Sequence, residues 1–450
     1  MIEWTLLGVA WLVTAIAAQA QQWPLQGTTL FENVRVFDGT GSPVSEPTNV
    51  LVRDGVIAKI SADPIPVDRS ATTTIIAGDG RTLMPGLIDA HWHTMLIRTT
   101  PLQALNSGVG YLNLLAAEEA RSTLMRGFTT VRDMGGPSFD LKRGIDEGLV
   151  WGPRIYPSGA MISVTSGHGD FRSPTELPRP LGTAQSRIEQ IGGAMIADSP
   201  DEVRLRAREQ LMQGASQIKL TAGGGVSSPF SPLDVSTFTE PEMRAAVEAA
   251  DNWGTYVATH AYTPAAIQRA INAGVKVIEH GHLMDEATAQ MMADKGIWLS
   301  AQPFMPDTGG GARQLGASEQ AKKAQVAAGT SNVYRLAKKY NVKTAFGTDI
   351  LFSKEDAEKQ GSRLVDLLKW YTPTEILRMA THDNGELLEL TGLRNPYPGK
   401  LGVVQEGAIA DLLLVEGDPT KSLELVTDPS TNFKVIMKDG KIYKNALEWR

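Results

Sequence analysis

Short apolar runs alternate with amphipathic segments through the middle of the chain, from residue 86 to residue 398. The segments TEPEMRAAVEAADNWG and TPAAIQRAINAG place apolar residues at helical spacing, and each ends at a glycine, as helices often do. Strands that alternate with helices predict β-α units and a parallel sheet. The strands that the pattern predicts are Gly86–His91, Thr129–Asp133, Arg154–Ser158, Gln217–Leu220, Tyr256–His260, Val277–His280, Trp298–Ala301 and Thr344–Asp349.

The two ends of the chain carry a different pattern. Between residues 28 and 76, short β-rich runs are separated by turn signals, and the Asp-Gly pairs at 38–39, 54–55 and 79–80 suit hairpins. The C-terminal runs ADLLLVEGDP and FKVIMKDGKIYKN repeat this pattern. We therefore predict an α/β protein, in which a (β/α)8 TIM barrel at 86–398 carries a small β-sandwich domain built from 21–85 plus 399–450.

The composition narrows the chemistry that the chain can perform. Its 450 residues are 42% hydrophobic and 21% charged, as expected for a folded globular protein. The formal net charge of -7 argues against a nucleic-acid binder, which normally has a basic face. The absence of cysteine excludes disulfides, thiolate zinc sites and cysteine nucleophiles. A metal ion would therefore be held by histidine, carboxylate or modified lysine side chains.

The N-terminal sequence WTLLGVAWLVTAIAAQAQQ has an apolar core followed by the pattern Ala18-Gln19-Ala20. It predicts a signal peptide over residues 1–20, and hence a periplasmic or secreted protein with no stable membrane association after cleavage. The lack of cysteine fits an oxidising compartment. The alternative is an uncleaved apolar helix that anchors the protein or packs on its surface, because Glu3 and no basic residue precedes the apolar core.

Two histidines one residue apart follow the first apolar run of the middle region, in MPGLIDAHWHTML. Side chains alternate along a strand, so His91 and His93 lie on one face, and Trp92 points the other way, toward the helical layer. Other predicted strands carry or end in Lys219, His260, His280 and Asp349. Each histidine alone would suit a structural role. Together at one end of a barrel they predict a bound ion, because unpaired charges are costly in a protein interior.

The stretches PGLIDAHWH, QIKL, YVATH, VIEHG and FGTD occur in the order found in the metal-dependent amidohydrolase superfamily, which this sequence resembles over nearly its whole length. Four further stretches resemble the imidazolonepropionase-like branch, which contains Xaa-Pro and Xaa-Lys/Arg dipeptidases and the ochratoxin-hydrolysing amidohydrolases. These stretches are RGFTTVRDMGG, SGHGD, GGGVSS and EGAIADLLLVEGDP.

The resemblance implies two divalent metal ions bound by His91, His93, Lys219, His260, His280 and Asp349. The histidine pair of the first strand and the aspartate would bind one ion, and the histidines of the fifth and sixth strands would bind the second. The amine of Lys219 would be carboxylated and would bridge the ions, because an ammonium beside two dications would be repelled. An unmodified lysine beside a single ion is the alternative. Nitrogen and oxygen ligands suit zinc, and also manganese or cobalt.

The resemblance also implies a mechanism, in which a hydroxide that bridges the two ions attacks the scissile carbonyl, since bound metal lowers the pKa of water to about 7. Asp349 would take the proton of this hydroxide and deliver it to the leaving amine. His168, in TSGHGD, would donate a hydrogen bond to the oxyanion or to a substrate carboxylate, or would instead cap a turn beside the glycines.

Three further residues are predicted substrate contacts. Gly224, in a run of three glycines, would let the backbone approach the substrate closely. Tyr262 is a substrate contact or a packing residue, and His282 lines the pocket or lies behind it. Arg98 and Arg172 are candidates for binding a substrate carboxylate.

Three other polar residues attract attention in the sequence. Arg132 and Asp133 form either an internal ion pair or a support for the site. His382 is expected to be structural.

We expect a carboxypeptidase-like or dipeptidase-like amidohydrolase that cleaves the amide between an acyl group and a C-terminal amino acid. Hydrolysis of ochratoxin A, which releases phenylalanine, is the preferred reaction, and prolidase or Xaa-Lys/Arg dipeptidase activity is the nearest alternative. A cyclic amidase or deaminase, and a metal-stabilised binding protein, are more distant alternatives. The partners implied are a small-molecule amide or dipeptide and, because relatives are often assemblies, further copies of the chain in a homo-oligomer.

Overall fold

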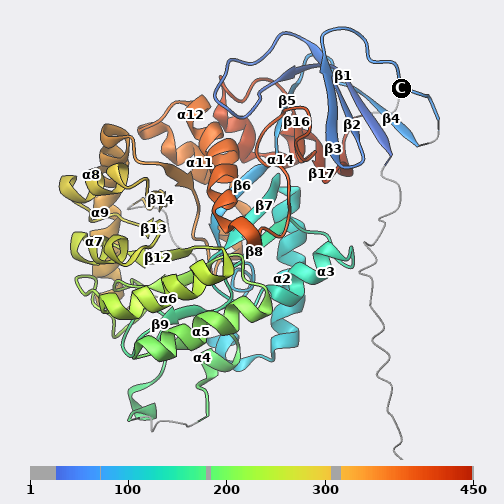
Figure 1. Cartoon of the computed structure of the whole chain (residues 1–450). Helices are drawn as coiled ribbons and strands as arrows, with labels where there is room; N and C mark the ends of the chain where they lie inside the picture. Colours follow the sequence, from blue (N-terminus) through green and yellow to red (C-terminus); the bar gives the residue numbers. More distant parts are fainter. Residues whose placement is uncertain (1–26, 71, 179–183, 306–315, 448–450) are drawn as a thin grey trace, which may run out of the picture.

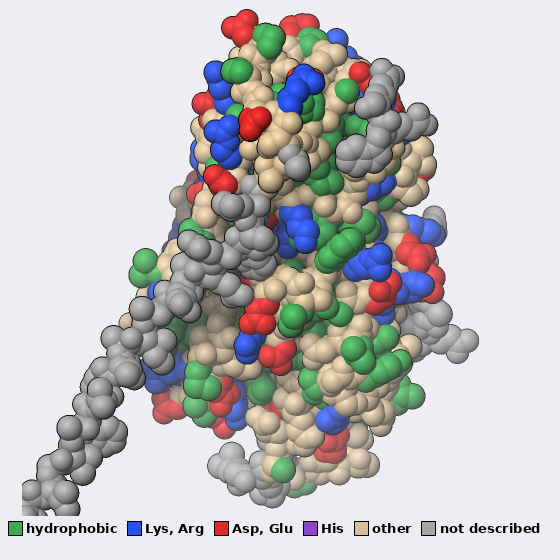
Figure 2. Space-filling model, turned by 90° about the vertical axis from the view of Figure 1, so that its right-hand side faces the viewer, with side chains coloured by type: hydrophobic (Ala, Val, Ile, Leu, Met, Phe, Trp, Pro, Cys, Tyr) green, Lys and Arg blue, Asp and Glu red, His purple; other side chains and the backbone are tan. Residues whose placement is uncertain are grey.

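The computed structural model describes residues 27–70, 72–178, 184–305 and 316–447. Parallel strands lie in the middle of the molecule with helices outside them, and a separate sheet that contains β1 and β17 lies at one end (Figure 1). The predicted signal peptide at residues 1–20 lies outside the described residues. Within those ranges, no helix combines the length and the apolar character that crossing a bilayer requires. Acidic and basic side chains are interspersed on the face shown in Figure 2.

Ten parallel strands form two sheets, one with the order β10-β9-β11-β12-β13-β14-β15 and the other with the order β6-β7-β8. All eight strands predicted for the middle of the chain are present, with ends shifted by at most three residues. The three-residue strands β9 and β10 were not predicted, because their apolar runs are too short to stand out. The bounds are β6 (Leu87–Trp92), β7 (Phe128–Asp133), β8 (Arg154–Pro157), β9 (Met161–Ser163), β10 (Ala194–Ile196), β11 (Ile218–Thr221), β12 (Val257–Ala261), β13 (Val277–His280), β14 (Trp298–Ala301) and β15 (Thr344–Phe346).

Backbone hydrogen bonds join the three-stranded sheet to the seven-stranded sheet along both of its edge strands, β6 and β8. The amide of Asp349, after β15, donates to the carbonyl of His91 on β6 at 2.8 Å. The amide of Ser216, before β11, donates to the carbonyl of Pro157 on β8, also at 2.8 Å. The first and last predicted strands therefore lie side by side, and their carboxyl ends face the same region of the molecule.

Strand β15 ends three residues earlier than predicted, at Phe346, so that Asp349 lies in the following loop. Gly347 is needed at this point, because a Cβ atom there would lie 2.9 Å from the backbone nitrogen of His91. Asp349 itself has a φ of 51°, in the left-handed region. His280, the last residue of β13, also has a positive φ, of 77°. Non-glycine residues held in this region are strained and cluster at functional sites.

The helices follow the predicted positions where the sequence carries strong termination signals. Helix α6 starts after Thr239, which forms a capping box, and ends at Gly254 with a φ of 71°. Helix α7 ends at Gly274 with a φ of 104°. The α-helices are α1 (Pro101–Asn106), α2 (Val109–Met125), α3 (Phe139–Asp146), α4 (Arg187–Gln190), α5 (Pro200–Gln213), α6 (Glu240–Trp253), α7 (Pro264–Ala273), α8 (Glu286–Asp294), α9 (Ala317–Tyr340), α10 (Lys354–Glu358), α11 (Ser362–Asp366), α12 (Pro373–Arg378), α13 (Asn384–Leu388) and α14 (Pro429–Asn432).

The two ends of the chain meet in one mixed sheet with the order β18-β17-β16-β5-β1-β2-β3, in which β4 pairs with β1. Of the three Asp-Gly pairs predicted to form hairpins, only that at 54–55 joins two paired strands, β2 and β3. The pair at 79–80 joins β4 to β5, which both pair with β1. The strands are β1 (Thr28–Val36), β2 (Thr48–Arg53), β3 (Val56–Ser61), β4 (Thr73–Ala77), β5 (Thr82–Pro85), β16 (Leu412–Val415), β17 (Phe433–Lys438) and β18 (Lys441–Asn445).

The side chain of Asn384 lies between β6 and β15 and bonds to the backbone of both strands. Its amide nitrogen donates to the carbonyls of Ile88 and Phe346 at 2.7 and 2.8 Å. Its amide oxygen accepts from the backbone nitrogen of Phe346 at 3.0 Å. Asn384 follows a π-helical turn at Met379–Asp383 and is completely buried. The side chain thus supplies hydrogen bonds that the two strands do not make with each other here.

We predict that Asn384→Leu lowers the free energy of unfolding by about 3 kcal/mol, because it leaves buried backbone groups without partners. Urea denaturation followed by circular dichroism measures the change. Asn106→Leu, at an exposed position of α1, is the matched control and should change the free energy by less than about 0.5 kcal/mol. Equal stability of Asn384→Leu and the wild type would contradict the role assigned to the Asn384 side chain.

Candidate metal centre

The six predicted metal ligands come together at the carboxyl ends of the parallel strands. All six line one cavity. The ring centroids of His91 and His93 are 5.3 Å apart, those of His91 and His280 are 5.1 Å apart, and those of His260 and His280 are 4.3 Å apart. Lys219, on β11, is 2% exposed and lines the same cavity. The geometry therefore gathers residues that are up to 258 positions apart in the sequence.

His91, His93 and Asp349 are the part of this cluster that is most clearly arranged for an ion. Their ligand atoms all lie within 4.8 Å of one another. Asp349 Oδ1 is 3.3 Å from His91 Nε2 and 3.1 Å from His93 Nε2. Two imidazole nitrogens and a carboxylate oxygen suit a divalent ion such as zinc.

Each histidine ring is oriented by a hydrogen bond on the side away from the cavity. His91 Nδ1 is 2.7 Å from Glu279 Oε2, and His93 Nδ1 is 3.1 Å from the carbonyl of Gly135. His280 Nδ1 is 2.6 Å from Gln302 Oε1. These acceptors place the ring proton on Nδ1, which leaves Nε2 as the nitrogen available to an ion.

His260 is oriented in the opposite sense. Its Nε2 atom is 2.8 Å from the carbonyl oxygen of Gly224, so Nδ1 is the nitrogen available to an ion. Gly224 was predicted to contact the substrate, but it does not line the cavity. A Cβ atom at Gly224 would lie 1.6 Å from the carbonyl oxygen of Pro232, so glycine is required for close packing of two backbone segments.

Burial sets the protonation of most of these groups. It lowers the pKa of His91, His260 and His280 well below the usual value of 6.5, which keeps the rings neutral and able to bind metal. Burial also lowers the pKa of Lys219 to about 8, against the opposing effect of the Glu279 and Asp349 charges. For His93, the hydrogen bond and charge of Asp349 outweigh burial, and its pKa is raised.

The donor set fits a metal centre, but the two halves of the cluster differ. His91, His93 and Asp349 supply three ligand atoms for one ion. His260 and His280 supply two nitrogens, so an ion beside them needs a further ligand. Among the described residues, the amine of Lys219 has no hydrogen-bond partner, and it lines the cavity together with both groups.

A buried ion pair lies behind His91. Arg132 Nη2 donates to Glu279 Oε1 at 2.6 Å, and Arg132 Nε donates to the carbonyl of Ala90 at 2.6 Å. Arg132 and Asp133 were predicted to pair with each other or to support the site. The structure gives them separate partners, because Asp133 accepts from the backbone nitrogens of Thr94 and Gly135.

His168 and Tyr262 line the cavity, as predicted for substrate contacts. The ring centroid of His168 lies 4.3 Å from that of His260, and the Tyr262 centroid lies 4.7 Å from it. His282 does not line the cavity. Its ring stacks on Phe304 at 5.1 Å, and its Nε2 atom is 2.9 Å from the carbonyl of Gln302, so it lies behind the wall.

Neither arginine predicted to bind a substrate carboxylate lines the cavity. Arg98 donates to Glu119 at 2.7 Å, and Arg172 donates to Asp170, also at 2.7 Å. These carboxylates therefore hold both arginine side chains outside the cavity lining.

Trp92 packs among residues of α2, as predicted, in a cluster that includes Leu112, Ala116 and Ala120. His382 lies in the π-helical turn and contacts Asp383 and Glu386 away from the cavity.

Sequence reasoning missed the residues that orient the ligands. Glu279 could have been found from the sequence, because it is a carboxylate next to His280 in an otherwise apolar strand. Nothing in the sequence marks Gln302 as a partner of a ligand. Asp89 was also missed: it accepts from the backbone of His91 at 3.0 Å and from Thr348 Oγ1 at 2.7 Å, and burial raises its pKa to about 6. It thereby ties β6 to the residue before Asp349.

The comparisons with known proteins agree with this geometry. The model of the amidohydrolase family matches residues 82–444, and the chain belongs to this family. It is therefore a hydrolase of the class that acts on amide bonds, and the resemblance predicted from the sequence is confirmed.

Three individual proteins are similar to this chain over most of its length. Ochratoxinase from Aspergillus niger is 29% identical over 435 residues, which cover 91% of this chain and 85% of that protein. The crystal structure of an amidohydrolase is 36% identical with a TM-score of 0.85, and covers 94% of this chain and 100% of its own. The crystal structure of a prolidase complexed with N-methylphosphonate-L-proline is 31% identical, also with a TM-score of 0.85, and covers 93% of this chain and 100% of its own.

We predict that Gln302→Leu weakens zinc binding by about 10- to 100-fold, because His280 Nδ1 loses the acceptor that fixes its ring. Titration of zinc into the metal-stripped protein, followed by calorimetry, measures the affinity. Gln290→Leu, at an exposed position of α8, serves as the control and should bind zinc like the wild type. An affinity of Gln302→Leu within twofold of the wild type would show that this hydrogen bond does not matter.

Proposed function

We propose that the chain is a metal-dependent amidohydrolase that releases a C-terminal amino acid from an N-acyl amino acid or a dipeptide. The observation that carries the proposal is the convergence of four histidines, a buried lysine and Asp349 on one cavity. Ochratoxin A is the preferred substrate, and the similarity to ochratoxinase over most of both chains supports it.

Two divalent ions, zinc by preference, would occupy the centre. His91, His93 and Asp349 would hold one ion, His260 and His280 would hold the other, and N-carboxylated Lys219 would serve both. When bound, such ions polarise a carbonyl group and lower the pKa of water, which supplies a nucleophile at neutral pH.

The buried amine of Lys219 suits carboxylation. Only a neutral amine adds to carbon dioxide, forming an N–C bond and losing one proton to give an anionic carbamate. The lowered pKa of Lys219, about 8, makes the neutral amine a larger fraction at neutral pH than it is for an exposed lysine. The carbamate would also replace a buried cation with an anion next to the ligand histidines.

Asp349 is the proposed proton carrier. Interaction with the neighbouring histidines, which includes the hydrogen bond from His93, outweighs burial and lowers the pKa of Asp349, so it is a carboxylate at neutral pH. It can accept the proton of the attacking water and then donate it to the nitrogen of the leaving amine.

His168 is the proposed donor to the carbonyl oxygen of the substrate. The Ser228 hydroxyl accepts from the backbone nitrogen of Gly169 at 3.1 Å, and its oxygen lies 2.9 Å from His168 Nδ1. We assign the hydroxyl proton to this second hydrogen bond, with His168 Nδ1 as the acceptor. The remaining ring proton is then on Nε2, on the cavity side. Burial lowers the pKa of His168 to about 4, so the ring is a neutral donor at neutral pH.

The cavity wall favours an apolar substrate with a single anionic group. Apart from Lys219, Lys323 is the one lysine or arginine among the described residues on this wall. We propose it as the binding partner of the substrate carboxylate in place of Arg98 and Arg172. The apolar residues on the wall are Leu96, Met161, Phe171, Val226, Phe304, Met305, Val326, Ala327, Leu351 and Phe352. Such a wall suits an aryl or alkyl acyl group and an apolar amino acid.

Prolidase activity is the second candidate. The observation that favours it is the similarity to a prolidase whose structure aligns over 93% of this chain. The apolar wall would accept proline as well as phenylalanine, so the cavity alone does not separate these two substrates.

We further propose the fold and location predicted from the sequence. The two parallel sheets would form one closed (β/α)8 barrel at 86–398, with the β-sandwich domain at 21–85 and 399–450. The backbone hydrogen bonds from Asp349 to His91 and from Ser216 to Pro157 support this closure. Export after removal of residues 1–20 and assembly into a homo-oligomer are proposed on the sequence alone.

We predict that the zinc-loaded protein releases phenylalanine from ochratoxin A, and that Asp349→Asn lowers kcat at least 100-fold because the leaving amine loses its proton donor. Chromatography of the released amino acid measures both rates. The same amide with a carboxamide in place of the carboxylate is the control substrate and should be cleaved at least 10-fold less efficiently.

A panel of Xaa-Pro and Xaa-Lys/Arg dipeptides runs beside this assay. Cleavage of Xaa-Pro peptides without any cleavage of phenylalanine amides would replace the preferred substrate by the prolidase alternative. Absence of cleavage of every amide, or an unchanged kcat for Asp349→Asn, would contradict the proposed function.

A further inference from the structure

Lys322, on α9, has an unusual environment for a buried ammonium group. Lys322 is 9% exposed, and its Nζ atom donates three hydrogen bonds, all of them to backbone carbonyl oxygens. Nζ lies 2.9 Å from the oxygen of Gly225, 2.8 Å from that of Ser228 and 3.1 Å from that of Ser231. A primary ammonium has three protons, so this set of carbonyls satisfies it completely.

The three carbonyls belong to one loop after β11, residues 224–231, which is neither helix nor strand. Carbonyl oxygens that converge in this way repel one another, and a cation at their centre removes that repulsion. The ammonium of Lys322 is such a cation, and it is carried by the longest α-helix among the described residues. The helix thus fixes the course of a segment that lacks regular hydrogen bonds of its own.

The same loop contacts two histidines of the site, His260 and His168. At one end of the loop, the Gly224 carbonyl orients the His260 ring. In the middle, Ser228 Oγ lies 2.9 Å from His168 Nδ1. Gly225 packs directly against His168, since a Cβ atom at Gly225 would lie 1.9 Å from Nδ1. A shift of the loop would therefore move both rings.

We propose that Lys322 is a positioning residue, which acts through loop 224–231 to set the orientations of His260 and His168. The ammonium takes the place of a structural cation and touches neither the cavity nor the ligand atoms. This inference rests on the proposed function for the roles of the two histidines. Its first effect, the fixed conformation of the loop, does not depend on the substrate.

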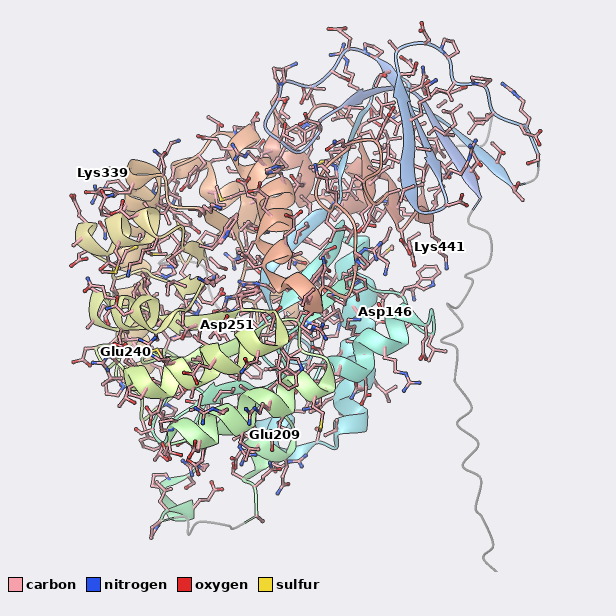
Figure 3. All side chains as sticks on the ribbon, viewed as in Figure 1. Asp146, Glu209, Glu240, Asp251, Lys339 and Lys441 are labelled. Carbon is pink, nitrogen blue, oxygen red and sulfur yellow. The ribbon has the colours of Figure 1, made fainter. Side chains whose placement is uncertain are left out.

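Three variants test this role. Lys322→Met removes the charge and keeps much of the side-chain volume, and Lys322→Ala leaves space for an added alkylammonium ion. Lys339→Met is the matched control, because Lys339 lies on the same helix with its Nζ atom 2.8 Å from Glu286 at the surface (Figure 3).

Hydrogen-deuterium exchange, read peptide by peptide by mass spectrometry, measures the loop directly. We expect faster exchange at residues 224–231 in Lys322→Met, with little change in α5 and α6, and wild-type exchange in Lys339→Met. Zinc affinity and kcat should each fall about 10- to 100-fold in Lys322→Met. In Lys322→Ala, n-propylammonium should restore kcat in a saturable way, and tetramethylammonium, which has no N–H donor, should not.

Wild-type exchange in the loop of Lys322→Met, or a kcat within twofold of the wild type, would overturn the inference. Loss of activity in Lys322→Ala that no alkylammonium restores would also overturn it. If Lys322→Met does not fold, Lys322→Gln, which loses the charge, is measured in the same way, and unchanged loop exchange together with unchanged zinc affinity in that variant counts against the inference. A wild type that cleaves no amide would contradict the proposed function, whereas the exchange comparison would still decide the role of Lys322.

Discussion

The buried ion pair between Arg132 on β7 and Glu279 on β13 is the interaction on which the metal centre depends. A buried pair is tolerated only when the remaining donors and acceptors of both groups are also satisfied. Arg132 uses its other nitrogens on the carbonyl of Ala90 and on the hydroxyl of Tyr256, at 2.6 and 3.2 Å. Glu279 uses its second oxygen on His91. The orientation of a ligand and the packing of several strands therefore cannot change independently.

The same principle extends to the other ligands, because buried polar atoms are in most cases hydrogen-bonded. Gly135, Gln302 and Gly224 supply those partners from the loops after three different strands. The ligand geometry is thus built into the whole set of parallel strands before any ion binds. Such pre-organisation reduces the rearrangement that metal binding requires.

Much of the arrangement could be predicted because it follows from the regular periods of strands and helices. The i, i+2 spacing of His91 and His93 placed His91 on the first strand and His93 directly after it, and the apolar run around Lys219 placed that residue on the correct strand. The partners of Arg98 and Arg172 were not predictable, because nothing in the sequence marks a local carboxylate as closer than the cavity. The contact between His91 and Glu279 joins residues 188 positions apart, and only the folded chain brings them together. Gly224 was misplaced for the same reason, whereas His282 lies behind the wall, which was one of its two predicted positions. The cavity wall is also built largely from loops, so the substrate is the least predictable feature.

The count of metal ions per chain tests the central claim most directly. Protein produced with zinc and bicarbonate, and its Lys219→Ala variant, are measured by mass spectrometry of the metal against protein concentration. We predict two ions per wild-type chain and at most one in Lys219→Ala, because the proposed carbamate bridge is lost while His91, His93 and Asp349 remain. One ion per wild-type chain, or two in both proteins, would contradict a centre built around a carboxylated Lys219.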